Sequence, residues 1–450
     1  MRLHRHHALW LLLLLAPAGV WAQAGPLTLR QAIDRALGQH PQAAMARADI
    51  AGATAAARQA RTNLLPQIAF TEDISRGNDP VYVFGQRLRQ RQFTQADFAL
   101  NSLNRPTPLG NFASRFSGSW TIFDSFKTER QIRRADFFKQ STSSASKAAD
   151  QQIVLGVVAA YQAVLYGQRK VDVAEHEEQT AEALFTQVDQ HVKAGLAVES
   201  DRMAAQVNQA ARKQDLIAAQ GELELAWADL GNAMGAPDLQ PSTLQPIGAH
   251  AFPDASLQEE LALAEKSRPD LAALNQAQKA QAAAVGAARS DFGPRINAYG
   301  NWEEDRGSIT SSGGNNWVAG VQISIDLMPF GKRDQLAREV ASRQRLEAQQ
   351  TQARNQIRLD ISRAHIQRQT AGQSMETARA AMDQAAENLR ILKNRYGAGL
   401  ATITDLLRAE DAERQSQTNY WQAVYGNALA YAQLLFAQGT LTPDAAEELQ

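Results

Sequence analysis

The sequence of 450 residues contains no cysteine. This absence excludes disulfide bonds, thiolate metal sites and the attachment of a lipid to a cysteine. Neither sign of charge is in excess, because 46 lysines and arginines are matched by 47 aspartates and glutamates. The chain therefore lacks the basic surplus of nucleic-acid-binding proteins, and we expect no nucleic-acid partner.

Patterns that indicate catalysis are also missing. The eight histidines are scattered, and those of the mature sequence show no metal-ligand spacing on one helical turn. Gly397-Ala398-Gly399 lacks the third glycine and the preceding strand of a dinucleotide-binding loop. Gly331-Lys332 lacks the glycine of a phosphate-binding loop. We therefore expect no enzyme activity, no cofactor and no metal site.

Long hydrophobic runs are absent after Ala24. Residues 1–24 combine Arg2 and Arg5, an apolar run from Ala8 to Leu15 and a small-residue cleavage site, which is typical of a signal peptide. An uncleaved anchor is the alternative, although the run is short for a membrane span. No later stretch approaches the roughly 18 consecutive apolar residues of a membrane helix, so any membrane crossing by the mature chain would use strands.

What the sequence does contain is a heptad pattern that stops at glycines. Apolar residues recur at alternating steps of four and three, as in a helix packed along a partner helix. They are Ala378, Met382, Ala385, Leu389, Leu392 and Tyr396. Gly397 and Gly399 favour the left-handed backbone of a helix end, and a second apolar helix follows at once. The stretch predicts the tip of a helical hairpin.

The same tip occurs once earlier in the chain, where Gly195-Leu196-Ala197 and Asp201 fall on Gly399-Leu400-Ala401 and Asp405 without gaps. Two Ala-rich coiled coils would align tolerably by chance, but several anchors coincide here.

The segments that precede the two hairpins are also repeated, with a larger separation in sequence than the two tips have. Thr28, Pro41 and Pro66 fall without gaps on Ser256, Pro269 and Pro294. Thr28 and Ser256 each begin the pattern of a capping box, and each proline follows or ends a predicted helix. The chain is therefore a duplication, with a first repeat over residues 25–235 and a second over 256–436. Residues 236–255 form a Pro-rich linker, and residues 437–450 form a C-terminal tail whose acidic part after Pro443 we expect to be mobile.

After the prolines the hydrophobic period changes from helix to strand. Strands are predicted near residues 66–75, 115–124, 294–304 and 317–327, with apolar and polar residues alternating over about ten positions. A transmembrane barrel and a soluble antiparallel sheet both fit this alternation. Aromatic residues near the strand ends indicate a membrane girdle; they are Trp120, Tyr299, Trp302, Trp317 and Phe330. One outer loop, 76–115, is long and rich in aromatic residues and arginine, whereas the other, 305–316, is short.

Helices of about 70 residues run from Asp124 to Gly195 and from Asp326 to Gly399, each about 100 Å long. Four strands per chain cannot close a barrel, and open edges cannot face lipid. The pattern therefore predicts several copies, and three copies give twelve strands.

In its signal peptide, duplication, Pro-led strands and paired Gly-Leu-Ala turns, the mature chain resembles the TolC family of outer-membrane efflux proteins. The resemblance implies a mainly α fold with a transmembrane β-barrel: a homotrimer whose twelve-stranded barrel lies in outer-membrane lipid and continues as an α-helical tunnel across the periplasm. It also implies an exit duct for a tripartite efflux pump or type I secretion, with a periplasmic adaptor and an inner-membrane transporter as partners. A soluble periplasmic coiled-coil adaptor or structural protein is the alternative.

In this family the helical tips close the periplasmic entrance. The resemblance assigns a gate here to Ser200, Asp201, Tyr396, Thr404, Asp405 and Arg408. It assigns adaptor contact to Gly195, Leu196, Gly399 and Leu400. The family's tip arginine falls on Ala401 and its second aspartate on Arg408, so the family's latch cannot be copied intact. We expect Arg408 or Arg202 to pair with Asp201 or Asp405 instead; solvated tip charges are the alternative.

Overall fold

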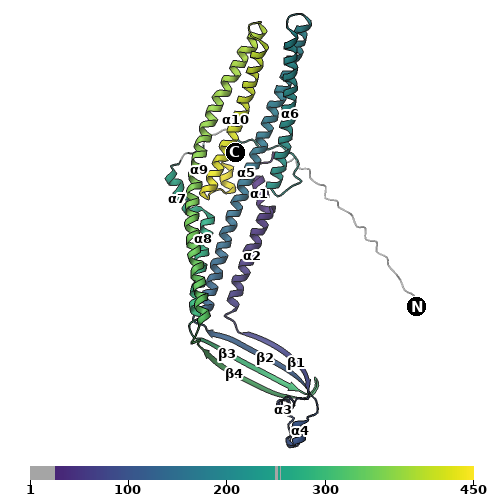
Figure 1. The fold of residues 1–450 in the computed structure, drawn as a ribbon, viewed down its shortest axis with the longest axis vertical. Helices are drawn as coiled ribbons and strands as arrows, with labels where there is room; N and C mark the ends of the chain where they lie inside the picture. The colour runs from purple at the N-terminus through teal and green to yellow at the C-terminus, as the bar shows by residue number, and fades with distance from the viewer. Residues whose placement is uncertain (1–25, 249–251, 254, 450) are drawn as a thin grey trace, which may run out of the picture.

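The computed structural model describes residues 26–248, 252–253 and 255–449 as an elongated body of long helices that continues into a single sheet (Figure 1). The expected signal peptide, residues 1–24, lies outside the described residues. The chain passes between helices and sheet twice, and the helical tips lie at the end opposite the sheet (Figure 1).

Two helices span the whole length from the sheet to the tips. They are α5 (Lys127–Lys193, 67 residues) and α9 (Phe330–Gly397, 68 residues). At about 1.5 Å per residue each is about 100 Å long, as predicted. The chain returns from the two tips through α6 (Glu199–Ala233) and α10 (Ile403–Gln438), which end midway along the body. The two hairpins expected from the heptad pattern are therefore present.

Four shorter helices pack on α5 and α9. In order, they are α1 (Leu29–Gln39), α2 (Pro41–Thr62), α7 (Leu257–Ser267) and α8 (Pro269–Ser290). Helices α1 and α7 lie midway along the body, and α2 and α8 run from there toward the sheet (Figure 1). Both predicted capping boxes form, with Thr28 bonded to Gln31 and Ser256 to Glu259. The following helices start with proline at their first position, where the missing N–H costs nothing.

The largest hydrophobic core forms a belt midway along the body. It unites α1, the middle of α5, the end of α10 and the linker, and the Tyr161 hydroxyl lies 2.7 Å from the carbonyl oxygen of Leu27 and 2.9 Å from that of Gln245. Within the described residues, a window of α5 is long and apolar enough to cross a membrane by length and composition alone. Several of its apolar residues, including Val157 and Val158, are buried in this belt.

The C-terminal segment belongs to the same belt, so the expectation of a mobile acidic tail after Pro443 is wrong for residues 444–449. Helix α11 (Pro443–Glu447) packs on α1, and Leu441 and Leu449 are fully buried. Arg30 of α1 forms an ion pair with Asp444. The prediction of mobility followed from the acidic composition of this segment and overlooked the apolar residues that anchor it.

The duplication extends to the ends of the return helices. Gly235 and Gly439 both end a helix in the left-handed conformation, with φ of 67° and 77°. A Cβ added at Gly235 would lie 2.8 Å from Cα of His40, and one at Gly439 would lie 2.7 Å from Cα of Arg268. Each return helix thus ends against the break that precedes Pro41 or Pro269, in the same way in both halves.

Four antiparallel strands form one sheet in the order β1-β2-β3-β4. The strands are β1 (Gln67–Gly77), β2 (Leu109–Phe123), β3 (Arg295–Arg306) and β4 (Gly314–Ser324). Two boundaries correct the sequence prediction. β2 begins at Leu109 rather than near 115, because its first residues pair with the end of β1. β4 ends at Ser324 rather than near 327, because its partner β3 starts at Arg295, directly after Pro294, which has no N–H to donate.

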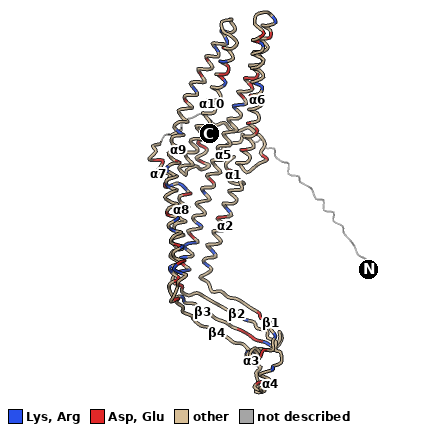
Figure 2. Tube along the Cα trace, in the orientation of Figure 1, with Lys and Arg blue, Asp and Glu red and all other residues tan. Residues whose placement is uncertain are grey.

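The register gives the sheet one apolar and one polar face. Phe70, Phe116, Trp302 and Trp317 lie in one row across the four strands, and Ile296 pairs with Ile323 on the same face. The opposite face carries Ser117, Asn301 and Gln322. Figure 2 shows charged residues gathered at the two ends of the sheet and few along its middle. This is the pattern of strands that face lipid on one side and water on the other.

One of the predicted girdle residues is on the wrong face for that role. Tyr299 pairs with Ser119 and Gly320 on the polar face, and its ring occupies the space where a Cβ of Gly320 would lie. Trp302 and Trp317 pair directly on the apolar face, as a girdle requires. At the helical end of the sheet the Trp120 indole donates to the carbonyl oxygen of Leu64, 2.9 Å away.

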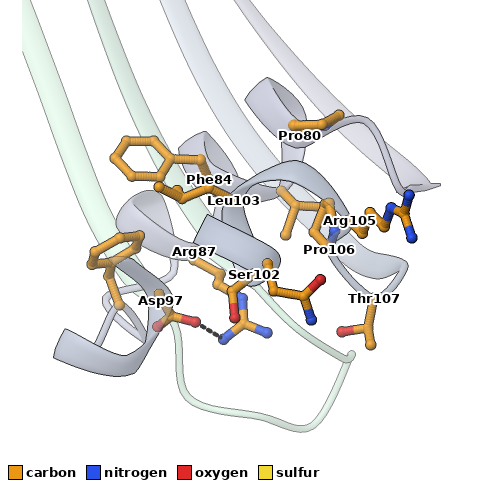
Figure 3. Close-up of a pocket in the computed structure, with 12 residues that line it drawn as sticks. Pro80, Phe84, Arg87, Asp97, Ser102, Leu103, Arg105, Pro106 and Thr107 are labelled. Carbon is orange, nitrogen blue, oxygen red and sulfur yellow. Dashed lines mark hydrogen bonds and ion pairs between the residues drawn. The ribbon is translucent and has the colours of Figure 1, made fainter. Parts of the chain in front are cut away.

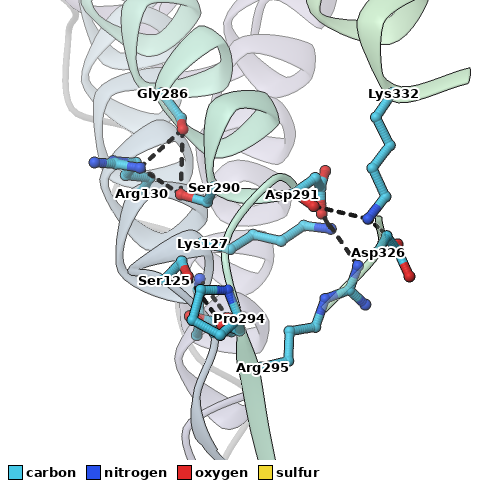
Figure 4. A network of polar contacts seen from close by, with 12 residues as sticks. Ser125, Lys127, Arg130, Gly286, Ser290, Asp291, Pro294, Arg295, Asp326 and Lys332 are labelled. Carbon is cyan, nitrogen blue, oxygen red and sulfur yellow. Dashed lines mark hydrogen bonds and ion pairs between the residues drawn. The ribbon is translucent and has the colours of Figure 1, made fainter. Parts of the chain in front are cut away.

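A polar network joins the helices to the sheet (Figure 4). Asp291 is 5% exposed. Its carboxylate accepts a hydrogen bond from the Lys127 ammonium at 2.7 Å, and its backbone carbonyl oxygen accepts one from the Lys332 ammonium at 2.7 Å. Ser125 has a positive φ of 59° and donates to the carbonyl oxygen of Pro294 at 2.9 Å. The start of α5, the end of α8 and the start of α9 are therefore fixed together where the chain changes from strand to helix.

The long outer loop is folded rather than irregular. Residues 78–108, between β1 and β2, contain α3 (Pro80–Arg89), a 3₁₀ turn η1 (Gln95–Phe98) and α4 (Leu100–Asn104). The corresponding connection between β3 and β4 is the short segment 307–313.

Candidate functional site at the helical tips

Both tips are built on the same backbone turn. Gly195 and Gly399 have φ of 73° and 71°, and their N–H groups donate to the carbonyl oxygens of Val192 and Tyr396, both at 3.0 Å. The next N–H, from Leu196 or Leu400, reaches back to His191 or Arg395 at 2.8 Å. These paired bonds are the Schellman motif, which satisfies the last carbonyl groups of a helix. The turns leave Leu196 and Leu400 exposed at 77% and 69%.

The second tip has an additional feature that the first lacks. Asp405 accepts hydrogen bonds from the backbone N–H of Thr402 at 3.1 Å and from its hydroxyl at 2.7 Å, which completes a capping box for α10. At the first tip the equivalent position before α6 is Val198, which has no side-chain cap. The spacing of Thr402 and Asp405 was readable in the sequence as a capping box, but the expectation of a gate role overlooked it.

The Asp405 carboxylate lies beside two arginines at the rim of an open hollow. Hydrogen bonds from the Thr402 hydroxyl and N–H, and then the charges of Arg408 and Arg395, hold the pKa of Asp405 below its usual range. Arg395, Leu400 and Arg408 line the hollow together with Asp405. The expected neighbourhood of Asp405 and Arg408 is present, although the direct partner of Asp405 is Thr402.

Arg202 does not take the predicted partner. Its guanidinium binds Glu199, three residues earlier on α6, with Nε 3.0 Å from Oε1. Residues three apart on a helix are neighbours on its surface, whereas adjacent residues such as Asp201 and Arg202 do not face each other, so the pair with Glu199 forms instead. Ser200 and Thr404 are exposed in the first turns of α6 and α10.

Tyr396 connects the two hairpins. Burial raises the pKa of Tyr396, and the negative charge of Asp201 on the other hairpin raises it further. Its ring packs on an apolar cluster that contains residues of all four tip helices. The buried members of this cluster are Leu184, Val188, Ala205, Leu389, Ile403, Leu406 and Ala409. Tyr396 therefore lies where the two hairpins meet, against the apolar cluster and near the negative charge of Asp201.

Further from the tips lies a buried charged cluster that the sequence argument missed. Glu177 of α5 and Glu410 and Glu413 of α10 are less than a tenth exposed. Burial, followed by the charges of Glu413 and Glu410, raises the pKa of Glu177 to about 7. Arg212 of α6 bridges to Asp215 and to Asp411 of α10, both at 3.0 Å. The signal was a polar interruption of the apolar pattern on α10, at Glu410 and Glu413.

The described residues contain no group of three or more histidine, aspartate or glutamate side chains that could hold a metal ion. The tips instead combine exposed leucines, an apolar cluster shared by two hairpins and charges that lie across the gap between them. The two hairpins are therefore joined at their tips by side-chain packing and by charge.

Comparison with known proteins identifies the class. The family model for outer membrane efflux proteins matches residues 32–236 and 261–440, so the chain belongs to this family, as its sequence predicted. The two matched segments follow the two repeats and leave out most of the linker. Family membership places the protein in the outer membrane.

Individual relatives are distant. Alkaline protease secretion protein AprF of Pseudomonas aeruginosa is 23% identical over 66% of this chain, and the match spans 63% of AprF. Protein CyaE of Bordetella pertussis is 25% identical over 72% of this chain and 69% of its own.

Solved structures share the fold at still lower identity. A CusC structure has a TM-score of 0.78 at 17% identity and covers 91% of this chain and 92% of its own. The outer-membrane channel OprN has a TM-score of 0.77 at 18% identity, with coverage of 92% and 90%. The predicted fold, mainly helical with a transmembrane sheet, is confirmed by this likeness to outer-membrane channels.

Proposed function

We propose that this chain is an outer-membrane channel-tunnel that serves as the exit duct of a tripartite efflux pump or a type I secretion system. The observation that carries the proposal is the sheet, which has an apolar face, a polar face and two unpaired edges, and continues into helices about 100 Å long. A periplasmic adaptor and an inner-membrane transporter would deliver the cargo to the tips. The duct itself performs no catalysis.

The functional unit in this proposal is a homotrimer. β1 and β4 are the edges of the four-stranded sheet, and their outward N–H and C=O groups have no partner within the sheet. Unpaired backbone groups cost several kcal/mol each in hydrocarbon, so the edges must pair with other copies. Twelve strands from three copies make a closed barrel of a size seen in outer membranes.

The expected result is a detergent-stable trimer. The mass of the solubilised protein, measured by light scattering after size exclusion, should be three times that of the chain, and the purified protein should form discrete conducting channels in planar bilayers. A population of monomers only, without conductance, would contradict the proposal.

The tips are the periplasmic gate of this channel in our proposal. The residues assigned to the gate are Ser200, Asp201, Tyr396, Thr404, Asp405 and Arg408. Support comes from the shared apolar cluster and from the effect of Asp201 on Tyr396, because both link the α5–α6 hairpin to the α9–α10 hairpin. The exposed Leu196 and Leu400, with Gly195 and Gly399 shaping their turns, would contact the adaptor.

The two routes of export predict different phenotypes. The name of AprF, a protease secretion protein, supports secretion, and the family name supports efflux. Deletion of the gene should either sensitise cells to small toxic compounds or remove a protein from the culture medium. Complementation by the native chain, but not by a chain that lacks both tip turns, would assign the defect to the duct.

A further inference from the structure

The first outer loop, residues 78–108, accounts for the whole length difference between the two halves in this region. Two pairs of equivalent residues show this difference. Before the strands, Pro66 and Pro294 are separated by more residues of sequence than Gly195 and Gly399 are after the strands. The loop between β1 and β2 covers 78–108 and the loop between β3 and β4 covers 307–313, and their lengths differ by the same amount. We call residues 78–108 the outer cap. It is an addition to one half that the scaffold of the other half does without.

The outer cap has its own small core. The ring of Phe93 lies between those of Phe84 and Phe98, with centroids 4.8 and 5.1 Å apart in edge-to-face contacts. The Arg87 guanidinium binds the Asp97 carboxylate at 2.7 Å beside a small cavity (Figure 3). Asp97 also completes a capping box with Thr94. These contacts fix α3 and the 3₁₀ turn η1 relative to one another.

Three consecutive residues at the end of α3 hold the cap on the sheet. Arg89 binds Glu303 at 2.8 Å, and Arg91 donates to the carbonyl oxygen of Asn315 at 2.9 Å. Between them, the Gln90 amide donates to Asn111 at 2.8 Å. Gln90 is 2% exposed and Asn111 is 1% exposed, so this contact is shielded from water.

The attachment is on the polar face of the sheet. Asn111 donates to Asp305 at 2.7 Å, and Glu303 also binds Arg115 at 2.9 Å. Asn111, Arg115, Glu303 and Asp305 all alternate with the apolar row that contains Phe116 and Trp302. In a barrel whose apolar face meets lipid, the cap therefore lies inside the lumen at its outer end.

The cap contacts strand β4 at Gly314, and we call this contact site the seat of the cap. A Cβ added at Gly314 would lie 2.0 Å from the carbonyl oxygen of Arg89, so only glycine lets α3 approach this closely. At Gly110, on the same rim, the nearest atom to an added Cβ is the carbonyl oxygen of Gly307 at 3.6 Å, an ordinary contact.

We propose that three outer caps close the outer mouth of the channel and set the size limit for entry from outside; this rests on the trimeric channel proposed above. A closed barrel of twelve strands is about 24 Å across between backbones. Side chains on the polar face narrow the opening further, and three helices of about 10 Å diameter packed around a central axis already occupy a circle about 22 Å across. One α3 from each chain is enough to fill the mouth, so export requires the caps to leave their seats.

The absence of cysteine makes the test direct, since an added thiol is the only one in the chain. Ser119 is exposed on the polar face of β2, eight residues beyond Asn111 and below the cap. In intact cells that produce the full-length Ser119→Cys protein, two thiol reagents are applied from outside. One is a small methanethiosulfonate. The other is a maleimide on a poly(ethylene glycol) coil that is narrower than an open barrel but wider than the gap between three caps.

With the native cap, the small reagent should label the thiol at position 119 and the large one should not. Adding Gly314→Ala should unseat α3 and let the large reagent through, whereas Gly110→Ala should leave the protection intact. If Gly314→Ala assembles poorly, Arg89→Ala with Arg91→Ala serves instead, because Glu303 keeps its pair with Arg115.

Labelling by the large reagent under the native cap would overturn the closure. So would its failure in the unseated variants when it does label Leu100→Cys on the exposed cap surface. Failure of the small reagent at position 119 in every variant would mean that the polar face is not a lumen, which would overturn the channel itself.

Discussion

At the scale of single residues, the four glycines with left-handed backbone in the described chain are of two kinds. Gly195 and Gly399 have no neighbouring atom within 4 Å of an added Cβ, whereas Gly235 and Gly439 lie against another backbone. The sequence predicted the turns at Gly195 and Gly399 because a heptad seam stops there. It could not show the close contact at Gly235, because that contact depends on His40, which is remote along the chain.

Alanine at these positions should therefore have unequal effects on stability. Gly195→Ala should cost about 1–2 kcal/mol for the left-handed backbone alone. Gly235→Ala adds a clash with His40, worth about 1–3 kcal/mol more. Thermal unfolding of the solubilised protein, followed by circular dichroism, should show a clearly larger drop in Tm for Gly235→Ala. Equal drops would mean that the contact relaxes at no cost.

The buried Glu177 should make the packing of the two hairpins depend on pH. Its pKa rises from 4.5 to about 7 in the folded chain, so the packed state favours the protonated carboxyl. Below pH 4.5 the Glu177 carboxyl is protonated in both the packed and the unpacked state, and its contribution to stability is fully present. Between pH 4.5 and 7 this carboxyl ionises only in the unpacked state, so its contribution to stability is lost. The groups that face Glu177 are Glu410, Glu413, Arg212 and Lys393. After screening by solvent, the loss is about 1–2 kcal/mol.

The expected measurement is a Tm that falls between about pH 5 and pH 8. Glu177→Gln should flatten this dependence and raise the Tm at the upper end of the range, since the amide mimics the protonated carboxyl. Glu175→Gln, at an exposed position two residues earlier, should leave the profile as it is. An unchanged profile in Glu177→Gln would assign the pH dependence to other groups.

At the scale of elements, the strands were predicted in number and face but not at their ends. The alternation through Ile323 and Gln322 gave the correct faces. The outer end of β2 was missed because its partner, the end of β1, could not be aligned with it from sequence. Likewise, the cap helices lie in a stretch where aromatic residues and arginine show no clear period, so only their contacts define them.

The faces of β4 predict opposite outcomes for neighbouring substitutions. Val321→Lys places a charge on the lipid side, which costs about 2–4 kcal/mol near the membrane midplane, so assembly in the outer membrane should fall. Gln322→Lys places the same charge in the lumen and should be tolerated. Heat-modifiable trimer in outer-membrane fractions measures both, and similar losses would show that β4 has no lipid face.

The hairpin tips predict a second contrast. Replacing both Tyr396 and Arg408 by alanine should weaken the contact between hairpins and raise the single-channel conductance without changing the yield of trimer. Arg390→Ala is the control, because Arg390 pairs with Glu387 on its own helix. Native conductance in the double variant would mean that Tyr396 and Arg408 do not set the constriction.

The sequence named these tip residues, but it could not show how their charges pair. Arg202 binds Glu199 within one helix, and Asp405 caps the start of α10. Both are local contacts, and in each case a partner three residues earlier on the chain, Glu199 or Thr402, forms the direct bond in place of the expected arginine–aspartate pair. The apolar cluster beneath the tips, by contrast, followed directly from the heptad seam.

At the scale of the whole molecule, two similar halves carry different additions. The linker and the C-terminal segment complete a belt around the middle of the body, and the outer cap fills one end. The tips and the cap lie at opposite ends of the structure (Figure 1). If both proposals hold, the duct has one closure at each end, formed by different parts of the chain.

The two unpaired edges of the sheet also constrain how the protein reaches its membrane. β1 and β4 each have 11 residues, so about five N–H groups point outward from each edge of a lone chain. A single chain that entered lipid first would expose all of them, and no later step could recover it quickly. For the proposed trimer, we therefore expect the three chains to come together before or during insertion. The rate of appearance of mature channels would then rise more steeply than linearly with the rate of synthesis, and an edge-damaged chain produced beside the native one would disable the mixed assemblies that it joins.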